Sequence, residues 1–315
     1  MPIANPNYFA GNPLERSSEK RGDSEWLAQQ LALPEAVMLP FWRGRPLIEA
    51  PEGPGGRQRP LWLSPAARSE FAADAPLILL GFRREVPYFA LDASASAPSA
   101  DNAPFADLGS YLGMREIAPS LAREDVAILG QALWLLDWHR RHRFCANCGA
   151  TTLPAGAGVS RRCNACECDH FPRTDPVAIV LAVHDDACLL GRGVKFPPGF
   201  FSALAGFLEP GETLEECAVR EVYEESGVRL TDVSYIFSQP WPFPSSLMVG
   251  FIAEAESRDL KLDETEIAEA RWVERETIAA LVRGERRDGL MIPPRFAIAH
   301  QLMAHWVGSQ SATAE

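Results

Sequence analysis

The sequence predicts a mixed α/β protein with more than one domain, and three observations support this prediction. The chain has 315 residues, roughly two domains' worth. Hydrophobic residues make up 47% of it and charged residues 23%, values typical of a globular protein that buries a core. Strand-like and helical segments alternate in its C-terminal part. We expect an N-terminal α+β supporting domain over 1–137, a four-cysteine segment over 138–172 and a C-terminal domain over 173–315.

The charge balance limits the partners of the chain. The formal net charge is −12 and the pI is about 5.1. This acidity argues against general binding to nucleic acid or to a membrane surface, although local basic residues occur at 140–143 (Arg-Arg-His-Arg) and at 161–162 (Arg-Arg). The longest apolar run, 177–183, is far shorter than the ~20 residues of a membrane span, and no signal-peptide pattern is found. These features predict a cytoplasmic protein without a membrane partner.

Proline and glycine interrupt the first 119 residues. The segment Pro51–Gly56 predicts a loop, and 94–104 predicts a linker or long turn. Two short apolar runs, Leu77–Leu80 and Pro87–Leu91, predict strands. No acids, histidines or nucleophiles gather here, which indicates a supporting role.

A helix is predicted from Ser120 to about His142, with acidic residues in its first turns. It leads directly into the cysteine cluster. His139 lies on this helix, and a surface position is favoured for it over a role beside the cluster. After the cluster, Val177–Val183 predicts a buried strand.

Four of the seven cysteines form two C-x-x-C pairs. The pairs are Cys145 with Cys148 and Cys163 with Cys166, and their spacing predicts a structural zinc site with four thiolate ligands. Cys168 is an alternative to Cys166, although the C-x-x-C register favours Cys166. A redox dithiol and a nucleic-acid-binding ribbon are further alternatives, which we rank below a structural site.

The segment 206–228 predicts an amphipathic helix with acidic side chains beside its buried stripe. Thr213 and Glu216 form a capping box, and Gly227 suits the helix end. By the helical period, Glu225 projects within roughly 20° of the centre of the stripe and Glu221 within roughly 60°. Half-buried like charges repel unless a cation lies between them, so we expect Mg²⁺ or Mn²⁺ here.

This segment resembles the Nudix box, G-x5-E-x7-R-E-U-x-E-E-x-G-U, and matches it at each fixed position. The matching residues are Gly206, Glu212, Arg220, Glu221, Val222, Glu224, Glu225, Gly227 and Val228. The resemblance implies an α/β/α sandwich and hydrolysis of a nucleoside diphosphate linked to another moiety. It also implies that Glu221 and Glu225 bind the metal and that Arg220 pairs with Glu212.

A proline-rich stretch, SQPWPFPSS, follows at 238–246. Alternating prolines remove backbone donors, so the stretch is not expected to be a central strand. Its aromatic side chains suit flat heterocycles, and Gln239 and the serines suit a ribose or amide. A proline-rich loop at the domain edge, or a peptide for an aromatic groove, is an equal alternative on these residues alone.

Together with the four cysteines, this stretch resembles the NADH pyrophosphatases of the NudC type. That resemblance implies metal binding by Glu266 besides Glu221 and Glu225, and a homodimer in which Phe171 reaches the partner's site. The implied substrate-binding residues are Phe171, Phe207, Gln239, Pro240, Trp241, Pro242, Phe243, Pro244, Ser245, Ser246 and Ala299. Phe171 replaces the usual tyrosine of the family, and Gly158 replaces a glutamate of some relatives.

The implied activity is metal-dependent hydrolysis of NADH, and less readily NAD⁺, to AMP and nicotinamide mononucleotide. The resemblance leaves the general base open among Glu221, Glu224, Glu225 and Glu266. Removal of NAD caps from RNA 5′ ends is an alternative that uses the same bond. A catalytically weak Nudix protein that senses a nucleotide is a third possibility, which the intact glutamates argue against.

Overall fold

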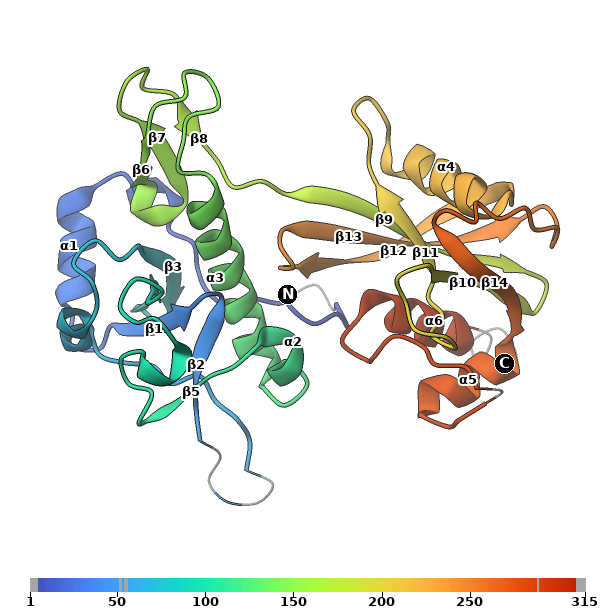
Figure 1. Ribbon diagram of the computed structural model, residues 1–315, viewed down its shortest axis with the longest axis horizontal. Coiled ribbons are helices and arrows are strands. Elements are labelled where there is room, and N and C mark those ends of the chain that lie inside the picture. Colours follow the sequence, from blue (N-terminus) through green and yellow to red (C-terminus); the bar gives the residue numbers. More distant parts are fainter. Residues whose placement is uncertain (1–4, 51–52, 54–55, 288, 310–315) are drawn as a thin grey trace. The chain divides into compact units, whose positions relative to one another are not determined.

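The computed structural model describes residues 5–50, 53, 56–287 and 289–309, which form two compact units (Figure 1). The N-terminal unit comprises residues 11–173 together with 242–245. The C-terminal unit comprises 174–241 and the described residues from 246 onward, together with 5–10. Each unit thus includes a short segment that lies far away in the sequence. The prediction had placed residues 5–10 in the N-terminal domain.

A five-stranded sheet forms the centre of the N-terminal unit, in the order β3-β4-β1-β2-β5. The predicted strands at 77–80 and 87–91 are confirmed, whereas part of the predicted loop Pro51–Gly56 lies outside the described residues. The strands are β1 (Val37–Trp42), β2 (Arg45–Glu49), β3 (Leu77–Arg83), β4 (Val86–Asp92) and β5 (Gly109–Tyr111).

The N-terminal unit also contains helices. The predicted long helix is confirmed as α3 (Arg123–Arg141), with Glu124 and Asp125 in its first turn, where their charge suits the helix dipole. The other helical segments are α1 (Ser24–Ala32), α2 (Met114–Ile117), and the 3₁₀ turns η1 (Ser18–Lys20), η2 (Pro65–Glu70) and η3 (Ala100–Asn102).

The cysteine segment forms a small three-stranded sheet directly after α3. Its elements are β6 (Thr152–Ala155), η4 (Gly156–Gly158), β7 (Ser160–Cys163) and β8 (Asp169–His170). Both predicted C-x-x-C pairs therefore lie in short turns that this sheet supports.

His139 joins α3 to this small sheet, so its predicted surface position is wrong. The residue is 3% exposed. Its Nε2 lies 2.7 Å from the Gly158 carbonyl oxygen and its Nδ1 lies 2.8 Å from Arg161 Nη1. The arginine donates to Nδ1, which makes Nε2 the protonated nitrogen of a neutral ring. Burial, and then the Arg161 charge, lower the pKa of His139.

A six-stranded sheet forms the centre of the C-terminal unit, with the path β12-β13-β9-β10-β14 and β11 paired to β9. β13 runs parallel to β9, while β10 and β11 run antiparallel to it. The strands are β9 (Asp175–His184), β10 (Ala187–Gly193), β11 (Leu204–Phe207), β12 (Leu230–Trp241), β13 (Ser246–Ala255) and β14 (Ile267–Glu274).

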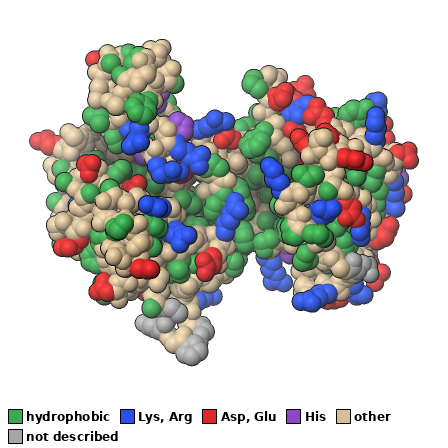
Figure 2. All heavy atoms as spheres, in the orientation of Figure 1, with side chains coloured by type: hydrophobic (Ala, Val, Ile, Leu, Met, Phe, Trp, Pro, Cys, Tyr) green, Lys and Arg blue, Asp and Glu red, His purple; other side chains and the backbone are tan. Residues whose placement is uncertain are grey.

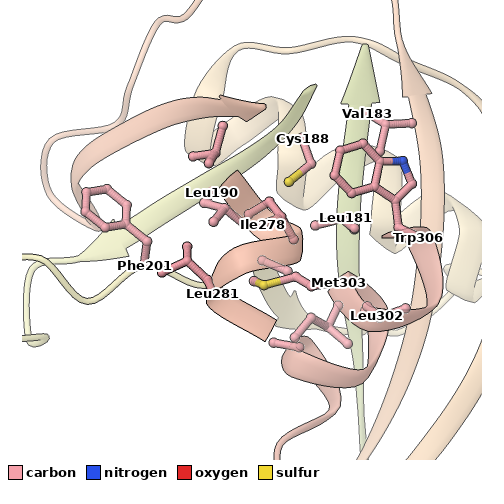
Figure 3. Packing of buried hydrophobic residues seen from close by; sticks show 14 of the residues in the cluster. Leu181, Val183, Cys188, Leu190, Phe201, Ile278, Leu281, Leu302, Met303 and Trp306 are labelled. Carbon is pink, nitrogen blue, oxygen red and sulfur yellow. The ribbon is translucent and has the colours of Figure 1, made fainter. Parts of the chain in front are cut away.

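Helices cover both faces of this sheet, which gives the α/β/α sandwich that the resemblance implies. Even-numbered residues from Ala178 to Ala182 of β9 pack in one cluster with α4 (Leu214–Ser226). Odd-numbered residues from Ile179 to Val183 pack in a second cluster with α5 (Arg275–Arg283) and α6 (Ile298–Ser309) (Figure 3). Because strand side chains alternate, a strand buried on both faces is apolar throughout, which explains the run at 177–183.

None of the helices in the described part of the chain has the length and apolar character of a membrane span.

We predict that His139 makes stability fall in mild acid. The unfolded ring binds a proton near its ordinary pKa, above that of the buried ring. As the pH falls through the unfolded value, the unfolded state therefore binds more protons and the free energy of unfolding decreases. The decrease is at most about 1.4 kcal/mol per pH unit for one proton. His139→Gln, which keeps a neutral donor and acceptor, is expected to show a shallower fall between about pH 7.5 and about pH 5.5.

Urea unfolding over this pH range measures the difference. The exposed His305 offers a control, and His305→Gln is expected to follow the wild type. Parallel curves for His139→Gln and the wild type would contradict the assignment.

Candidate active site and zinc site

The helix α4 carries the acidic side chains, and both of its predicted ends are confirmed. Thr213 and Glu216 form the reciprocal capping box, and Gly227 ends the helix at φ 73°. Cys217, Ala218 and Val222 are fully buried against the sheet. The helix is therefore anchored by its apolar stripe and orients its carboxylates from there.

Gly206 of β11 makes room for the carboxylate of Glu221. A Cβ atom at Gly206 would lie 1.8 to 2.1 Å from the carboxyl atoms of that side chain. Because real Cβ atoms never approach so closely, no larger residue fits here unless Glu221 moves. The first glycine of the motif is thus needed for space, since β11 and α4 approach each other closely at this point.

Arg220 connects the loop, the helix and β11. Its guanidinium donates to both carboxylate oxygens of Glu212, at 2.5 and 2.8 Å. It also donates to Glu221 at 2.8 Å, to Glu224 at 3.1 Å and to the carbonyl of Phe207 at 3.0 Å. The hydrogen bonds from Arg220, and then one from the Glu209 N–H, lower the pKa of Glu212 to about 2. The Arg220–Glu212 pair that the resemblance implies is present.

Glu225 is a buried carboxyl group with an unsatisfied oxygen. The residue is 8% exposed, and its Oε2 lacks a hydrogen-bond partner among the described residues. Burial, and then the charges of Glu221 and Glu266, raise the pKa of Glu225 to about 8. Burial likewise raises the pKa of Glu221. An acidic side chain that is desolvated beside two others is destabilised unless a positive charge joins it.

These residues fit a divalent cation. The buried unpartnered Oε2 of Glu225 is a free oxygen ligand, and Glu221 and Glu266 lie close enough to act on its charge. Carboxylate oxygens are the ligands that Mg²⁺ and Mn²⁺ prefer. Glu266 directly precedes β14, and its carbonyl accepts from the Val194 N–H at 2.9 Å. Glu266 is far from Glu225 in the sequence, yet its charge acts on that carboxyl group at the end of α4.

The four cysteines of the two C-x-x-C pairs form a zinc ribbon site. The ligand atoms of Cys145, Cys148, Cys163 and Cys166 all lie within 4.8 Å of one another. The separations are 3.6 Å between Cys145 and Cys166 and 3.5 Å between Cys148 and Cys163. Two thiolates on one tetrahedral zinc, each ~2.3 Å from it, lie roughly 3.8 Å apart.

Cys168 stays outside this group, so Cys166 is the fourth member, as the register indicates. Its sulfur lies 3.7 Å from the amide nitrogen of Asn147, which also reaches Cys166. Cys188 and Cys217 are buried core thiols, as expected.

The stretch 238–246 starts in β12, at the edge of the sheet, in agreement with its prolines. Gln239 is fully buried, and its amide is used within the protein. The amide nitrogen donates to the carbonyls of Tyr8 and Phe296, at 3.1 and 2.8 Å, and the oxygen accepts from the Ile298 N–H at 2.8 Å. Gln239 therefore holds β12 against the N-terminal segment and the start of α6.

Trp241 continues this arrangement. Its ring stacks on Phe296, with centroids 6.0 Å apart and an angle of 11° between the rings. Phe9 of the N-terminal segment meets its edge at 6.1 Å. Pro240 lies beside it in β12, whereas Pro242, Phe243, Pro244 and Ser245 belong to the N-terminal unit. Ser246 begins β13 and is buried.

The remaining predicted binding residues differ in exposure. Phe207 ends β11 and is well exposed, which suits a ring that contacts substrate. Ala299, in the first turn of α6, is buried. Phe171 follows β8 in the N-terminal unit and is strongly exposed.

Sequence reasoning missed the role of the N-terminal segment. The side-chain amides of Asn5 and Asn7 both donate to the carbonyl of Ser238, at 2.9 and 3.1 Å. These contacts join residues more than 230 positions apart. A single asparagine carries no local signal for such pairing, because its side chain suits many loops equally well.

Three family models match consecutive parts of the chain. The NUDIX domain matches residues 172–293, the zinc ribbon domain of NADH pyrophosphatases matches 140–171, and their rudimentary NUDIX-like domain matches 35–138. The supporting domain is therefore NUDIX-like. Together with the carboxylate site on α4, these matches show that the chain is a Nudix hydrolase.

Curated relatives narrow this class. The human NAD-capped RNA hydrolase NUDT12 is 35% identical over 96% of this chain and 73% of its own length. The NAD-capped RNA hydrolase NudC of Deinococcus radiodurans is 34% identical over 86% and 88%. The human mitochondrial NAD(P)H pyrophosphatase NUDT13 is 35% identical over 65% and 61%. The chain belongs to the Nudix hydrolases of the NADH pyrophosphatase, or NudC, type.

We predict that Gly206→Ala lowers activity at least about 100-fold while the fold is retained. The added methyl group displaces the Glu221 carboxylate, and small misplacements of reacting groups are costly. Gly308→Ala, in α6 of the same unit, is the control, because a Cβ atom there has nothing within 4 Å. Steady-state turnover and circular dichroism provide the comparison. Wild-type turnover in Gly206→Ala would show that the position of Glu221 does not matter.

Proposed function

We propose that this Nudix hydrolase cleaves the diphosphate bond of NADH, and less readily that of NAD⁺, to AMP and nicotinamide mononucleotide. The observation that supports it most is the buried, unpartnered carboxylate oxygen of Glu225 beside Glu221. A divalent cation would offset the cost of burying such a group in its charged form, and it would also neutralise charge on a diphosphate, the substrate class that the family's name describes. The intact glutamates argue against a mere nucleotide sensor.

The residues of the site have separate roles in this proposal. Glu221, Glu225 and Glu266 hold Mg²⁺ or Mn²⁺. Arg220 and Glu212 position the loop before α4 and keep Glu221 in place through the 2.8 Å hydrogen bond. Phe207 offers an exposed ring for the nicotinamide, and Trp241, supported by Phe296, offers a rigid edge for the nucleotide.

The reaction consumes one water molecule. Its oxygen forms a bond to one phosphorus, the bond from that phosphorus to the bridging oxygen breaks, and the leaving phosphate keeps the bridging oxygen. A divalent cation, when bound, supplies charge neutralisation on the diphosphate and a lowered pKa of the attacking water. One carboxylate among Glu221, Glu224, Glu225 and Glu266 accepts the proton of the water.

We predict that Glu225→Gln removes most of the hydrolysis and leaves the fold intact. Glutamine keeps the shape of the side chain but is a poorer ligand for a hard cation. The measurement is chromatography of AMP and reduced nicotinamide mononucleotide after incubation with NADH and Mg²⁺ or Mn²⁺. Glu215→Gln is the matched control, since Glu215 is an exposed glutamate of the same helix.

Near-normal product formation by Glu225→Gln would contradict the assignment of the metal site. If the wild type gives no product with either cation but binds NADH, the chain is a nucleotide sensor.

A second candidate function is removal of NAD caps from RNA by the same cleavage. Relatives such as the human and Deinococcus radiodurans proteins are named NAD-capped RNA hydrolases. The net charge of −12 favours the free dinucleotide, and a local basic surface would favour the capped RNA.

We also infer that the chain forms a homodimer, as the family resemblance implies. Its zinc ribbon part exposes large apolar side chains: Phe144 is 63% exposed, Leu153 57% and Phe171 72%. Contiguous groups of this kind mark interaction surfaces, and these three residues lie in or directly beside the strands of one small sheet.

Analytical ultracentrifugation tests this inference. The wild type is expected to sediment with twice the 34.6 kDa mass of one chain. The double variant Phe144→Ser with Leu153→Ser is expected to shift toward the monomer, whereas Leu108→Ser, at an exposed leucine in the same unit, is expected to stay dimeric. A wild type that is monomeric at all concentrations would contradict the dimer.

A further inference from the structure

The N-terminal unit contains a groove of about 940 Å³, whose lining does not include the glutamates, Phe207 or Trp241 of the proposed active site. The turn between β1 and β2, the segment after β4, α2, the end of α3 and residues 242–244 line it. We name it the arginine groove, because its charged lining residues are Arg43, Arg115, Arg140 and Arg141, with Asp92 and Asp137. Basic side chains gather around the C-terminal end of α3 in Figure 2.

The charge of this groove is opposite to that of the chain. Four arginines and two aspartates give a local net charge of +2, whereas the whole chain carries −12. Asp137 binds Arg140 at 2.5 Å and Arg141 at 2.8 Å, and one carboxylate cannot neutralise two guanidinium groups. Both arginine side chains remain more than half exposed. They therefore present positive charge to a ligand in the groove.

Two further arginines are stacked on aromatic rings. The Arg115 guanidinium lies 4.5 Å from the centre of the Phe243 ring, and the Arg43 guanidinium lies 4.7 Å from that of Trp42. A guanidinium group is planar, and its N–H groups suit the oxygens of a phosphate. Several cations along one groove are characteristic of sites that follow the phosphate backbone of a single-stranded nucleic acid.

The sequence connects this groove to the nucleotide-binding stretch of the proposed active site. Phe243 lies only two residues after Trp241, in the same nine-residue segment 238–246. We propose that the arginine groove binds phosphates of the single-stranded RNA that carries the NAD cap. This inference rests on the second candidate function, because it assigns that function's RNA chain to a site.

The test compares one variant on two substrates. Arg140→Gln with Arg141→Gln removes two cations and leaves the aromatic residues unchanged. We expect kcat/KM for an NAD-capped single strand of about ten nucleotides to fall about tenfold, mainly through KM, and kcat/KM for NADH to change less than about twofold. The slope of log kcat/KM for the capped strand against log salt concentration is expected to become shallower by about 1.4, from two lost phosphate contacts.

The C-terminal unit offers a matched control. Arg283 and Arg287 are two exposed arginines that share one carboxylate, Glu285, as Arg140 and Arg141 share Asp137. Arg283→Gln with Arg287→Gln therefore removes the same charge in the same kind of arrangement. It is expected to retain wild-type kinetics on both substrates and the wild-type salt slope.

Each other outcome overturns the inference. Unchanged kinetics on the capped strand show that the groove does not bind RNA. An equal rise of KM for NADH and for the capped strand shows that it binds the dinucleotide instead. If poly-glutamate inhibits cleavage of the capped strand as strongly as uncapped RNA does, the groove is a general polyanion site.

A failure of the proposed function is distinguishable from these outcomes. If the wild type cleaves neither substrate, fluorescence anisotropy with a labelled 5′-phosphorylated single strand tests the groove directly. Binding that is lost in Arg140→Gln with Arg141→Gln, and kept in the control, supports it. No binding by the wild type overturns it.

Discussion

The carboxyl group of Glu225 is buried close to the charge of Glu221. Several features of the C-terminal unit serve to hold it in this place. Desolvation and like charges both disfavour ionised groups in such a place, so the surrounding structure must supply the stabilisation. The apolar stripe of α4 anchors the helix on the sheet. The capping box and Gly227 then determine where the helix begins and ends. Arg220 offsets part of the charge and ties the loop to the helix.

The six-stranded sheet determines how closely α4 can approach β11. β9 supplies side chains to both layers, and its partner β11 carries Gly206 at the point where the Glu221 carboxylate meets the backbone. A second connection runs from Arg220 to the carbonyl of Phe207, one residue further along β11. The Glu221 carboxylate and the exposed Phe207 ring are therefore positioned by the same short strand.

Features that depend only on residues close together in the sequence could be predicted from the sequence. The capping box, the helical period of the acidic residues and the C-x-x-C register each act within a few residues, and the structure agrees with them. Val177–Val183 was equally clear, because a strand buried on both faces must be apolar throughout.

Contacts between segments that are distant in the sequence could not be predicted from local patterns. His139 lies on a helix among charged residues, which favours the surface, yet Arg161 and Gly158 from the following hairpin enclose it. Gln239 looked suited to a ribose, but its amide is engaged by Tyr8, Phe296 and Ile298. Both positions depend on partners that only the folded chain brings near. For Gln239 the partner at Tyr8 comes from the other end of the sequence.

The stretch 238–246 begins and ends in the C-terminal unit, and its residues 242–245 belong to the N-terminal unit. Pro240 lacks an N–H donor, so the paired end of β12 has one donor fewer than other strand ends. The structure compensates from outside the sheet. Asn5 and Asn7 donate to the Ser238 carbonyl, Phe9 and Phe296 contact the Trp241 ring, and Arg115 stacks on Phe243. Proline thus supplies stiffness within the stretch, while side chains from distant segments supply its position. Trp241 ends the paired strand β12 and Phe243 lies beyond it, and each ring is held by contacts with segments that are distant in the sequence.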